Sequence, residues 1–495
     1  MLDNVLGSRV FTLQNSQLFA NETGDFNPIH IDQTVASQTV FGTCIVHGMH
    51  LLLWGLDRFF DVTQRKATVV EVSCVFRRAV LINELVECRS FSHPSAEVQE
   101  LRMLIMGVEV AAIKFTLTNE FSEEPVNCSN RSGVEVTQAI PSDPLKSDLH
   151  SLSGGWVLPR LSKKLITNFP SLLKLQGEIF IQSMAQLSVL VGMRCPGLHS
   201  LISEFTLTRK NVYKKATKLE FSVKKFDTRF SLVQISVLSG PFEGLVSCFV
   251  RSRKVKQSSI EALSEKLKPL LKNNPFEGHK PLVIGGSRGL GQVTCKILAL
   301  GGASPVFTYL RDVTGAESVL EEILRYGLEA EARQFDVLGS DEERKVLVAE
   351  TKATNLYYYA TPAIFLGNRE VFSKKLLYRF TKFYISGLAQ LVSDMVPQGL
   401  SSVCAPSTTA LNDKMPGMLE YCVAKAGMEY YCESMASSHM DVKFVVPRFP
   451  RLETDQTTNF VSVHNEDPVQ YILNSVLKTQ GVEALSYKYY DSSGR

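Results

Sequence analysis

The sequence lacks the features that mark secreted, metal-binding and membrane-spanning chains. Its ten cysteines are scattered over 495 residues without a Cys-x-x-Cys pair or another metal-ligand spacing. This favours free thiols in a reducing compartment over a disulfide framework or a metal site. The longest apolar runs, such as IVHGMHLLLWGL at 45–56, are short and contain histidines, so no transmembrane span is predicted. The start, MLDNVLGSRVF, has no long apolar run and is not read as a signal peptide, so the cytoplasm is the expected location.

A strong net charge is also absent. The 53 Lys and Arg residues against 50 Asp and Glu leave a formal net charge of +3, which is too small to indicate a nucleic-acid partner. The length is too great for one hydrophobic core, so about two to four domains are expected.

Two stretches rich in turn-forming residues divide the chain into three parts. The first, about 121–156, is rich in Ser, Pro, Asn and Asp, and the second, about 255–279, combines a short amphipathic helical pattern with turn residues. We therefore predict domains at 1–125, 150–257 and 278–495.

The first two parts share one pattern. In the first, an apolar helical run at about 43–60 precedes alternating strand patterns such as VEVAAIKFTLT at 108–118. In the second, the apolar helix at 177–193 precedes four strand patterns between 201 and 255. The predicted α+β fold is one helix wrapped by an antiparallel sheet, used twice.

The third part differs. KPLVIGGSRGLGQVTCKILALGG at 280–302 is an apolar strand, a glycine-rich turn and a helix, and strand and helix patterns alternate after it. This order predicts an α/β domain with a doubly wound parallel sheet.

The stretch GDFNPIHID at 24–32 raises the first functional question, because Asp25 and His30 stand five residues apart in a loop with a proline. Taken alone, Asp25 and His30 can equally be interpreted as ordinary residues of a turn. As a site, an acid and a base here could remove the C2 proton of a 3-hydroxyacyl thioester and protonate its leaving hydroxyl. Unpaired backbone N–H groups at a helix start near Gly48 could stabilise the enolate oxygen.

The surrounding string, LFANETGDFNPIHIDQTVASQTVFGTCIVHGMHLLLWGL at 18–56, closely resembles the MaoC-like (R)-specific enoyl hydratase family. The resemblance covers about residues 5–60 and implies a hot-dog fold and lyase chemistry. It also implies that Asp25 and His30 are the catalytic pair, and that Gly48 lies at the oxyanion position while Asn27 shapes the loop.

Residues 157–254 have no second string of this kind, and their only histidine is His199, which we interpret as structural. The resemblance implies a double hot-dog in which this half has lost the catalytic pair and widened for a long acyl chain. The basic segments at 209–215 and 251–256 are either a solvated surface or a contact for phosphates or an acidic carrier protein.

The glycine-rich turn of the third part has the spacing Gly-x-x-x-Gly-x-Gly. This spacing lets a backbone approach a pyrophosphate and points a helix N-terminus at it. The next strand pattern ends with Arg311 instead of an acidic residue, and with Arg288 it favours a ribose 2′-phosphate, hence NADPH. The loop residues predicted to bind this cofactor are Gly285, Ser287, Arg288, Gly289, Leu290 and Gly291.

Tyr421 and Lys425 stand four residues apart in EYCVAKAGMEYY, on one face of a predicted helix. An ammonium beside a phenol lowers the phenol's pKa, so the phenol can pass a proton to a carbonyl during hydride transfer. Without the glycine-rich turn, an incidental Tyr and Lys would be the better interpretation.

Together these motifs resemble the short-chain dehydrogenase/reductase family over about 280–465. The resemblance implies a Rossmann-type fold and an oxidoreductase with a catalytic Tyr421 and Lys425. The family's serine falls on Thr408, thirteen residues before the tyrosine, and Ser407 is the alternative. Further cofactor-binding residues implied by the resemblance are Asp336, Ala360, Lys425 and Thr454.

Two positions depart from that family. Its Asn-Ala-Gly motif is replaced by Tyr359-Ala360-Thr361, and the helix Asn of its proton relay is replaced by Phe383 or Tyr384. The relay is therefore altered, and the reductase is either working, slow or lost.

The sequence thus predicts a bifunctional enzyme of fatty acid, polyketide or lipid metabolism. An NADPH-dependent reductase would reduce a 3-oxoacyl thioester, and the lyase would dehydrate the (R)-3-hydroxyacyl product to a trans-2-enoyl thioester, or hydrate it in reverse. The acyl carrier is coenzyme A or a carrier protein, and resemblance implies a homo-oligomer. The alternatives are a monofunctional dehydratase with a degenerate nucleotide-binding domain and a non-catalytic acyl-thioester-binding protein.

Overall fold

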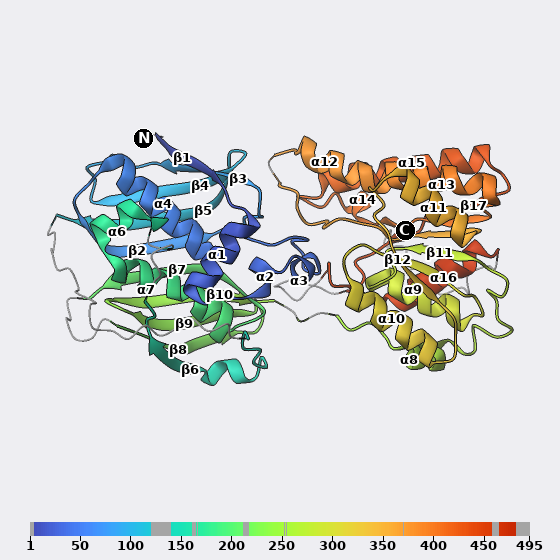
Figure 1. Cartoon of the computed structure of the whole chain (residues 1–495), viewed down its shortest axis with the longest axis horizontal. Coiled ribbons are helices and arrows are strands. Elements are labelled where there is room, and N and C mark those ends of the chain that lie inside the picture. The colour runs from blue at the N-terminus through green and yellow to red at the C-terminus, as the bar shows by residue number, and fades with distance from the viewer. Residues whose placement is uncertain are drawn as a thin grey trace, which may run out of the picture. The chain divides into compact units, whose positions relative to one another are not determined.

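The computed structural model describes residues 4–119, 140–160, 165, 167–210, 217–251, 253, 255–369, 371–457 and 465–481. Most of the first predicted linker and most of the basic segment at 209–215 lie outside them. The chain forms two compact units, unit 1 within Met1–Arg253 and unit 2 mainly within Lys254–Thr458 (Figure 1). The separation of residues 1–125 from 150–257 as two domains stays a prediction.

Unit 1 is built on one ten-stranded antiparallel sheet with the order β1-β3-β4-β5-β2-β7-β10-β9-β8-β6. β2 and β7 pair at its centre, so a first half (β1–β5) meets a second half (β6–β10) there. From edge to centre, the second half repeats the strand order of the first. The strands are β1 Asn4–Val10, β2 Thr68–Phe76, β3 Leu85–Ser90, β4 Val98–Ile105, β5 Val108–Thr118, β6 Ser153–Val157, β7 Ser200–Arg209, β8 Lys218–Asp227, β9 Leu232–Ser239 and β10 Phe242–Val250.

Alternation explains why these segments are strands with one buried face. In β5 the side chains of Ile113, Phe115 and Leu117 are buried, whereas Lys114 between them is exposed. β6 is the exception, because the first predicted linker runs to 156 but Ser153–Val157 pair with β8. This short strand has mostly exposed residues, as suits a sheet edge.

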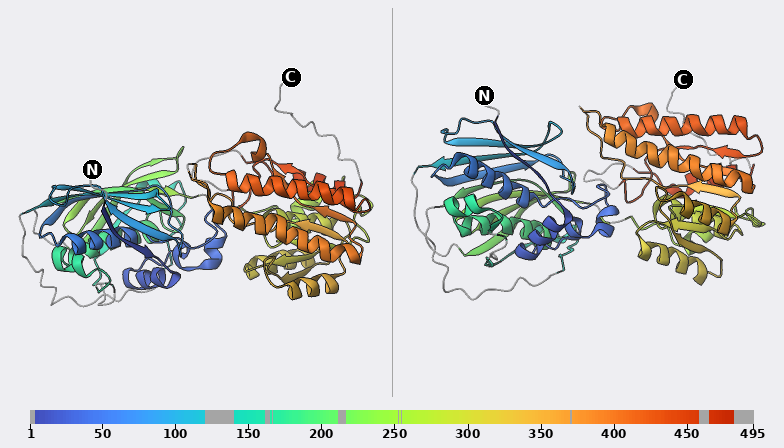
Figure 2. Two further views of the ribbon diagram at one scale, coloured as in Figure 1. Left: turned by 90° about the horizontal axis from the view of Figure 1, so that it is seen from above. Right: turned by 45° about the horizontal axis from the view of Figure 1, so that its top comes forward.

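The helices α4 and α7 lie on the same face of the curved sheet (Figure 2). α4 is buried almost all round from Met49 to Phe60, as expected of a helix enclosed by a core. It packs against α6 and α7 from the second half, and one apolar cluster runs through both halves. The helical segments of unit 1 are α1 Leu13–Thr23, α2 Pro28–Ile31, α3 Gln33–Ser37, α4 Gly48–Thr63, η1 Asp148–Ser151, α6 Pro170–Gln176, α7 Glu178–Val189 and η2 Leu190–Arg194.

Unit 2 contains a six-stranded parallel sheet with the order β13-β12-β11-β14-β15-β17. The order reverses beside β11, which defines a Rossmann-type switch point. Strands β11 and β14 are entirely buried, as parallel strands covered on both faces must be. The strands are β11 Pro281–Ile284, β12 Val306–Tyr309, β13 Glu331–Gln334, β14 Asn355–Tyr358, β15 Ser402–Cys404 and β17 Lys443–Val445, and a small second sheet pairs β16 Ser407–Thr408 with β18 Arg448–Phe449.

Helices cover both faces of this sheet (Figure 1). One apolar cluster includes α8, α9, α10 and α16, and another includes α11, α12, α13 and α15. The helical segments are α8 Ile260–Leu267, α9 Gly289–Leu300, α10 Val313–Arg325, α11 Asp341–Thr351, α12 Lys374–Thr381, η3 Lys382–Gly387, α13 Leu388–Met395, η4 Val396–Gln398, α14 Ala410–Asp413, α15 Leu419–Ser438 and α16 Pro468–Thr479.

Two of the predicted absences can be compared with the described residues. Every cysteine among them is a free thiol, and nearly all are buried. Within the same residues, no helix has the length and apolarity needed to cross a membrane.

Candidate active sites

The loop that carries Asp25 and His30 is shaped by consecutive helix caps. Gly24 ends α1 in the left-handed conformation, with φ 92°, which favours glycine. The Asn27 side chain then caps α2 by accepting a hydrogen bond from the Ile29 N–H at 3.2 Å. Asp32 caps α3 in the same way, at 2.8 Å from the Thr34 N–H. Residues within the stretch 24–32 therefore determine the backbone conformation of this loop.

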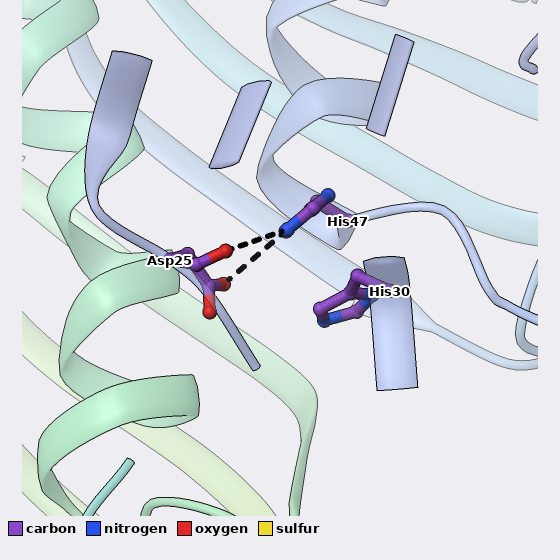
Figure 3. A group of neighbouring side chains, drawn as sticks. All are labelled: Asp25, His30 and His47. Atoms are coloured by element: carbon purple, nitrogen blue, oxygen red, sulfur yellow. Dashed lines mark hydrogen bonds and ion pairs between the residues drawn. The ribbon is translucent and has the colours of Figure 1, made fainter. Parts of the chain in front are cut away.

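The structure brings Asp25 and His30 together and adds His47 to them (Figure 3). All three side chains are buried. The His47 Nε2 atom lies 3.3 Å from the backbone oxygen of Asp25 and 3.8 Å from its Oδ2 atom. The imidazole rings of His30 and His47 stack with centroids 3.9 Å apart. His47 was not among the predicted site residues, although it directly precedes Gly48 in the stretch IVHGM that could have revealed it.

Asp25 and His30 border a cavity of about 350 Å³ within unit 1. Most of its wall is apolar and comes from both halves of the sheet, which suits an acyl chain more than a polar ligand. The remaining wall residues include Phe41, Ile45, Met49, Leu51, Phe76, Val80, Ser188, Val191, Gly192, Ile202 and Phe249.

Burial separates the proton affinities of the predicted pair. It raises the pKa of Asp25 to about 7, although hydrogen bonds from Ser188 and from the Asn27 N–H oppose the rise. Burial also lowers the pKa of His30 to about 4. At neutral pH His30 is therefore an uncharged base, while a substantial fraction of Asp25 is a protonated acid. Two neighbouring groups with such opposed shifts have the proton affinities that an acid/base pair needs.

The tautomer of His30 follows from its partner. Its Nδ1 atom lies 2.9 Å from the carbonyl oxygen of Ile45. Because a carbonyl oxygen only accepts hydrogen bonds, Nδ1 carries the hydrogen, and the lone pair is on Nε2. His30 Nε2 is therefore the atom that can take a proton.

Gly48 is the first residue of α4 and lines the cavity. The N–H groups of a first helical turn have no partner within the helix and attract negative charge. A Cβ atom on Gly48 would stand 3.0 Å from the Phe76 ring and 3.2 Å from Ile202, so a larger residue would crowd the cavity. The oxyanion role of Gly48 stays a prediction.

Asp25, His30 and His47 also offer three metal-ligand atoms within 4.8 Å of one another. The two imidazole rings are stacked, however, with only 27° between their planes. Imidazole lone pairs lie in the ring plane, so stacked rings do not aim them at a common point. The geometry supports acid/base chemistry, and the predicted absence of a metal stays a prediction.

In unit 2 the glycine-rich turn has the shape of a phosphate-binding loop. Gly285 and Gly289 have φ values of 84° and 55°, in the left-handed region. A Cβ atom on Gly291 would stand 2.1 Å from the Gly285 carbonyl oxygen, so only glycine fits there. α9 begins at Gly289, which points its N-terminus at this loop. The loop therefore fits the pyrophosphate of a nicotinamide nucleotide.

Two of the other predicted cofactor residues lie near that loop. Thr454 lies 3.8 Å from where a Gly289 Cβ would stand, and the Ala360 nitrogen 3.4 Å from that of Gly285. Ser287 is buried, Arg288 and Leu290 are half-buried, and Arg311 and Asp336 are exposed. The Asp336 carboxylate accepts a hydrogen bond from the Leu338 N–H at 2.9 Å.

Tyr421 and Lys425 both lie in α15, as predicted. The hydroxyl of Thr408 bonds to Tyr421, whereas Ser407 lies beside Glu429. Of the two candidate hydroxyls, Thr408 is thus the one at the phenol. Whether it is catalytic stays a prediction.

The expected effect of Lys425 on the phenol is not observed. Burial raises the pKa of Tyr421. Lys425 instead donates to the Pro406 carbonyl oxygen at 2.6 Å and lies over the ring of Tyr384, 4.0 Å from its centroid. Burial lowers the pKa of Lys425 to about 7, so a neutral amine is accessible there at physiological pH.

The two altered family positions form hydrogen bonds of their own. Tyr384 is buried in the π-helical turn η3, with its hydroxyl 2.5 Å from Thr361 Oγ1 and its ring edge-on to Tyr421. The Tyr359 hydroxyl lies 2.8 Å from Thr294 Oγ1 on α9. Tyr384, rather than Phe383, therefore fills the place beside the phenol and the lysine.

Comparison with known proteins gives separate matches for the two kinds of motif. Residues 7–111 match the MaoC like domain. A 3-oxoacyl-[acyl-carrier-protein] reductase of Synechocystis sp. is 28% identical over 204 residues, covering 38% of this chain and 78% of the relative. A short chain dehydrogenase, penD, of Penicillium thymicola is 29% identical over 175 residues, covering 32% and 62%.

Among solved structures, part of this chain matches a short-chain dehydrogenase/reductase from Serratia marcescens, with a TM-score of 0.39 and 17% identity, covering 42% of this chain and 95% of that one. A short chain dehydrogenase from Burkholderia cenocepacia in complex with NADP gives a TM-score of 0.38 and 16% identity, covering 42% and 95%.

The chain therefore joins a dehydratase-like domain to an oxidoreductase-like region. More closely, it is a fusion of a MaoC-like domain, which has the hot-dog fold, with a short-chain dehydrogenase/reductase region, which has the Rossmann-type sheet. The fusion predicted from the two sets of motifs is confirmed.

Proposed function

We propose that the protein reduces 3-oxoacyl thioesters with NADPH and dehydrates the resulting (R)-3-hydroxyacyl thioesters to trans-2-enoyl thioesters, or runs the hydration in reverse. The observation that carries the proposal is the buried Asp25–His30 pair, whose pKa values are displaced in opposite directions at one apolar cavity. The 3-oxoacyl reductase among the relatives supports the substrate class. These two reactions are consecutive, which gives a chemical reason for the fusion.

In the proposed lyase reaction, His30 Nε2 removes the C2 proton of the hydroxyacyl thioester. The backbone N–H groups at Gly48 stabilise the negative charge that develops on the thioester oxygen. The Asp25 carboxyl then donates its proton to the leaving hydroxyl, and water is released. In hydration, Asp25 takes a proton from water, and His30 returns one to C2.

In the proposed reductase reaction, Tyr421 gives its phenolic proton to the substrate carbonyl oxygen, which Thr408 orients. A nicotinamide cofactor, when bound, supplies the hydride. Gly285, Gly289 and Gly291 would hold its pyrophosphate, and Arg311 would favour NADPH over NADH through the 2′-phosphate. Lys425 would bind the ribose hydroxyls.

The proposal extends to the architecture. Unit 1 would be a double hot-dog made of domains 1–125 and 150–257, of which only the first carries an acid/base pair, with the reductase at 278–495. The acyl group would arrive on coenzyme A or a carrier protein, and the enzyme would act as a homo-oligomer in the cytoplasm. The repeated strand order and the helices α4 and α7 support the double hot-dog.

Product analysis tests both modules at once. The full chain is incubated with NADPH or NADH and with 3-oxoacyl thioesters of several lengths on each carrier, and the products are identified by mass. We expect a trans-2-enoyl product, formed faster with NADPH. A 3-hydroxyacyl product that never loses water would rule out the dehydratase activity. Equal rates with both cofactors would rule out the proposed role of Arg311.

A second candidate function follows from the altered relay. Lys425 is bonded to the Pro406 carbonyl oxygen, and Tyr384 replaces the helix Asn of the family, which favours a dehydratase whose reductase region only binds nucleotide. It predicts hydration of enoyl thioesters with no reduction of any 3-oxoacyl substrate. The same product analysis separates the two functions.

The pH dependence of the lyase follows from the two displaced pKa values. The reactive pair holds one proton, which requires a pH above the pKa of His30 and below that of Asp25. For hydration of a trans-2-enoyl thioester, kcat/KM is expected to fall below a pKa of about 4 and above one of about 7. A steady-state pH profile measures this, and activity that keeps rising from neutral to alkaline pH would contradict the assignment.

A further inference from the structure

The catalytic loop of unit 1 is bound to the second half of the sheet at several points. The Asn27 Nδ2 atom donates to the carbonyl oxygens of Gly192 at 3.0 Å and Leu198 at 3.3 Å. The Gln186 side chain on α7 donates to the Thr23 carbonyl oxygen at 2.9 Å. The loop that begins at Gly24 is therefore held against α7 and the turn that follows it.

One of these contacts reaches the carboxyl group itself. The Ser188 hydroxyl, near the end of α7, donates to Asp25 Oδ2 at 2.5 Å, the short distance expected of a bond to a carboxylate. Ser188 lines the same cavity as Asp25 and His30. The other carboxyl oxygen, Asp25 Oδ1, accepts a hydrogen bond from the Asn27 N–H at 3.2 Å.

Gly192 closes on the same carboxyl from the π-helical turn η2. A Cβ atom there would stand 2.6 Å from Asp25 Oδ1 and 3.0 Å from Oδ2. No side chain fits at these distances, so the turn packs its bare backbone against the carboxyl group. π-helical turns within helices often occur at functional sites, because they redirect a few residues.

We infer that Ser188 is a positioning residue for the carboxyl of Asp25, and that the second half, although it has no acid/base pair of its own, completes the lyase site through Ser188 and Gly192. The inference deepens the proposed lyase function and rests on it. The Ser188 hydroxyl holds one carboxyl oxygen, and Gly192 leaves the space in which the group is held. The proton that Asp25 transfers is thereby aimed along one direction.

The test is Ser188→Ala in the full chain. Loss of one hydrogen bond to a carboxylate is expected to lower the kcat of enoyl-thioester hydration about 10- to 100-fold, with KM almost unchanged. The bond stabilises the charged form of Asp25, so its loss raises the pKa of that carboxyl, and the alkaline limb of the pH profile moves to higher pH. Wild-type kcat with an unmoved limb would overturn the inference.

Matched variants separate positioning from damage to α7. Ser183→Ala removes a buried hydroxyl from the same helix, one that donates to the Ile179 carbonyl oxygen, and is expected to leave kcat and the limb unchanged. Ser188→Thr keeps a hydroxyl on the same Cβ atom and is expected to return the limb to its wild-type position. An equal loss in Ser183→Ala, or no return with threonine, would overturn the inference.

A measurement without turnover keeps the inference distinct from the proposed function. The carboxyl of Asp25 is titrated by difference infrared spectroscopy, assigned with Asp25→Asn, in wild-type and Ser188→Ala proteins. A higher titration midpoint in Ser188→Ala supports the contact even if the wild-type chain hydrates no substrate, in which case the proposed function alone fails. Equal midpoints overturn the positioning role even in an active enzyme.

Discussion

Replacing Asp25 with Asn is expected to lower the kcat of hydration of a short trans-2-enoyl thioester about 10³-fold, since a positioned acid/base group contributes roughly 10²–10⁴-fold. Asparagine keeps the shape of the buried side chain and its bond to Ser188 but has no proton to transfer at neutral pH. His30→Ala is expected to give a loss of the same order. The loss is measured by the change in enoyl absorbance.

Two controls show whether that loss is chemical. Glu22→Gln makes the same carboxyl-to-amide change in α1, three residues earlier and away from the cavity lining, and is expected to retain wild-type kcat. NADPH oxidation by unit 2 in Asp25→Asn should also be unchanged. If Asp25→Asn and His30→Ala both keep full hydratase activity, the acid/base assignment is wrong.

The second large effect is expected in unit 2. Tyr421→Phe removes the hydroxyl that Thr408 contacts and that would protonate the substrate, so NADPH oxidation with a 3-oxoacyl thioester should fall about 10²–10⁴-fold. Hydration by unit 1 should persist at its wild-type rate. Absorbance of NADPH follows the first reaction, and enoyl absorbance follows the second.

Tyr430→Phe is the matched control, because it lies on the same helix with its side chain 74% exposed. It is expected to leave both activities unchanged. If Tyr421→Phe oxidises NADPH as fast as the wild-type chain, the proton donor is a different group. A wild-type chain that oxidises none would favour the nucleotide-binding alternative.

Local patterns predict most of the fold because the spacing of apolar residues in each element indicates which of its faces is buried. VEVAAIKFTLT predicts a strand at 108–118, and β5 has these bounds. The apolar run at 177–193 predicts one helix, whereas α7 ends at Val189 and a π-helical turn continues to Arg194. That turn depends on what packs against it, the catalytic loop of the first half, and no pattern within the run reveals it.

Some residues of the candidate site can be predicted from the sequence, and others are found only from the fold. Asp25, His30 and Gly48 lie in one continuous motif, so the sequence identifies them without the fold. Ser188 is 163 residues from Asp25, and an isolated serine near a helix end carries no signal. The expected effect of Lys425 on Tyr421 fails for a related reason, because spacing in a helix does not reveal that the amine turns to the Pro406 carbonyl oxygen.

The pairing of β2 with β7 at the centre of the unit 1 sheet has a consequence for how the site is assembled. The groups that hold the Asp25 carboxyl belong to the same polypeptide as the carboxyl, so they meet by an intramolecular step with a fixed effective concentration. If the two halves were separate chains, the groups that hold the carboxyl would come from another molecule. The site would then be lost when the two molecules dissociate on dilution. Here the assembly of the proposed lyase site does not depend on protein concentration. The two halves are always present in a one-to-one ratio because they belong to one polypeptide.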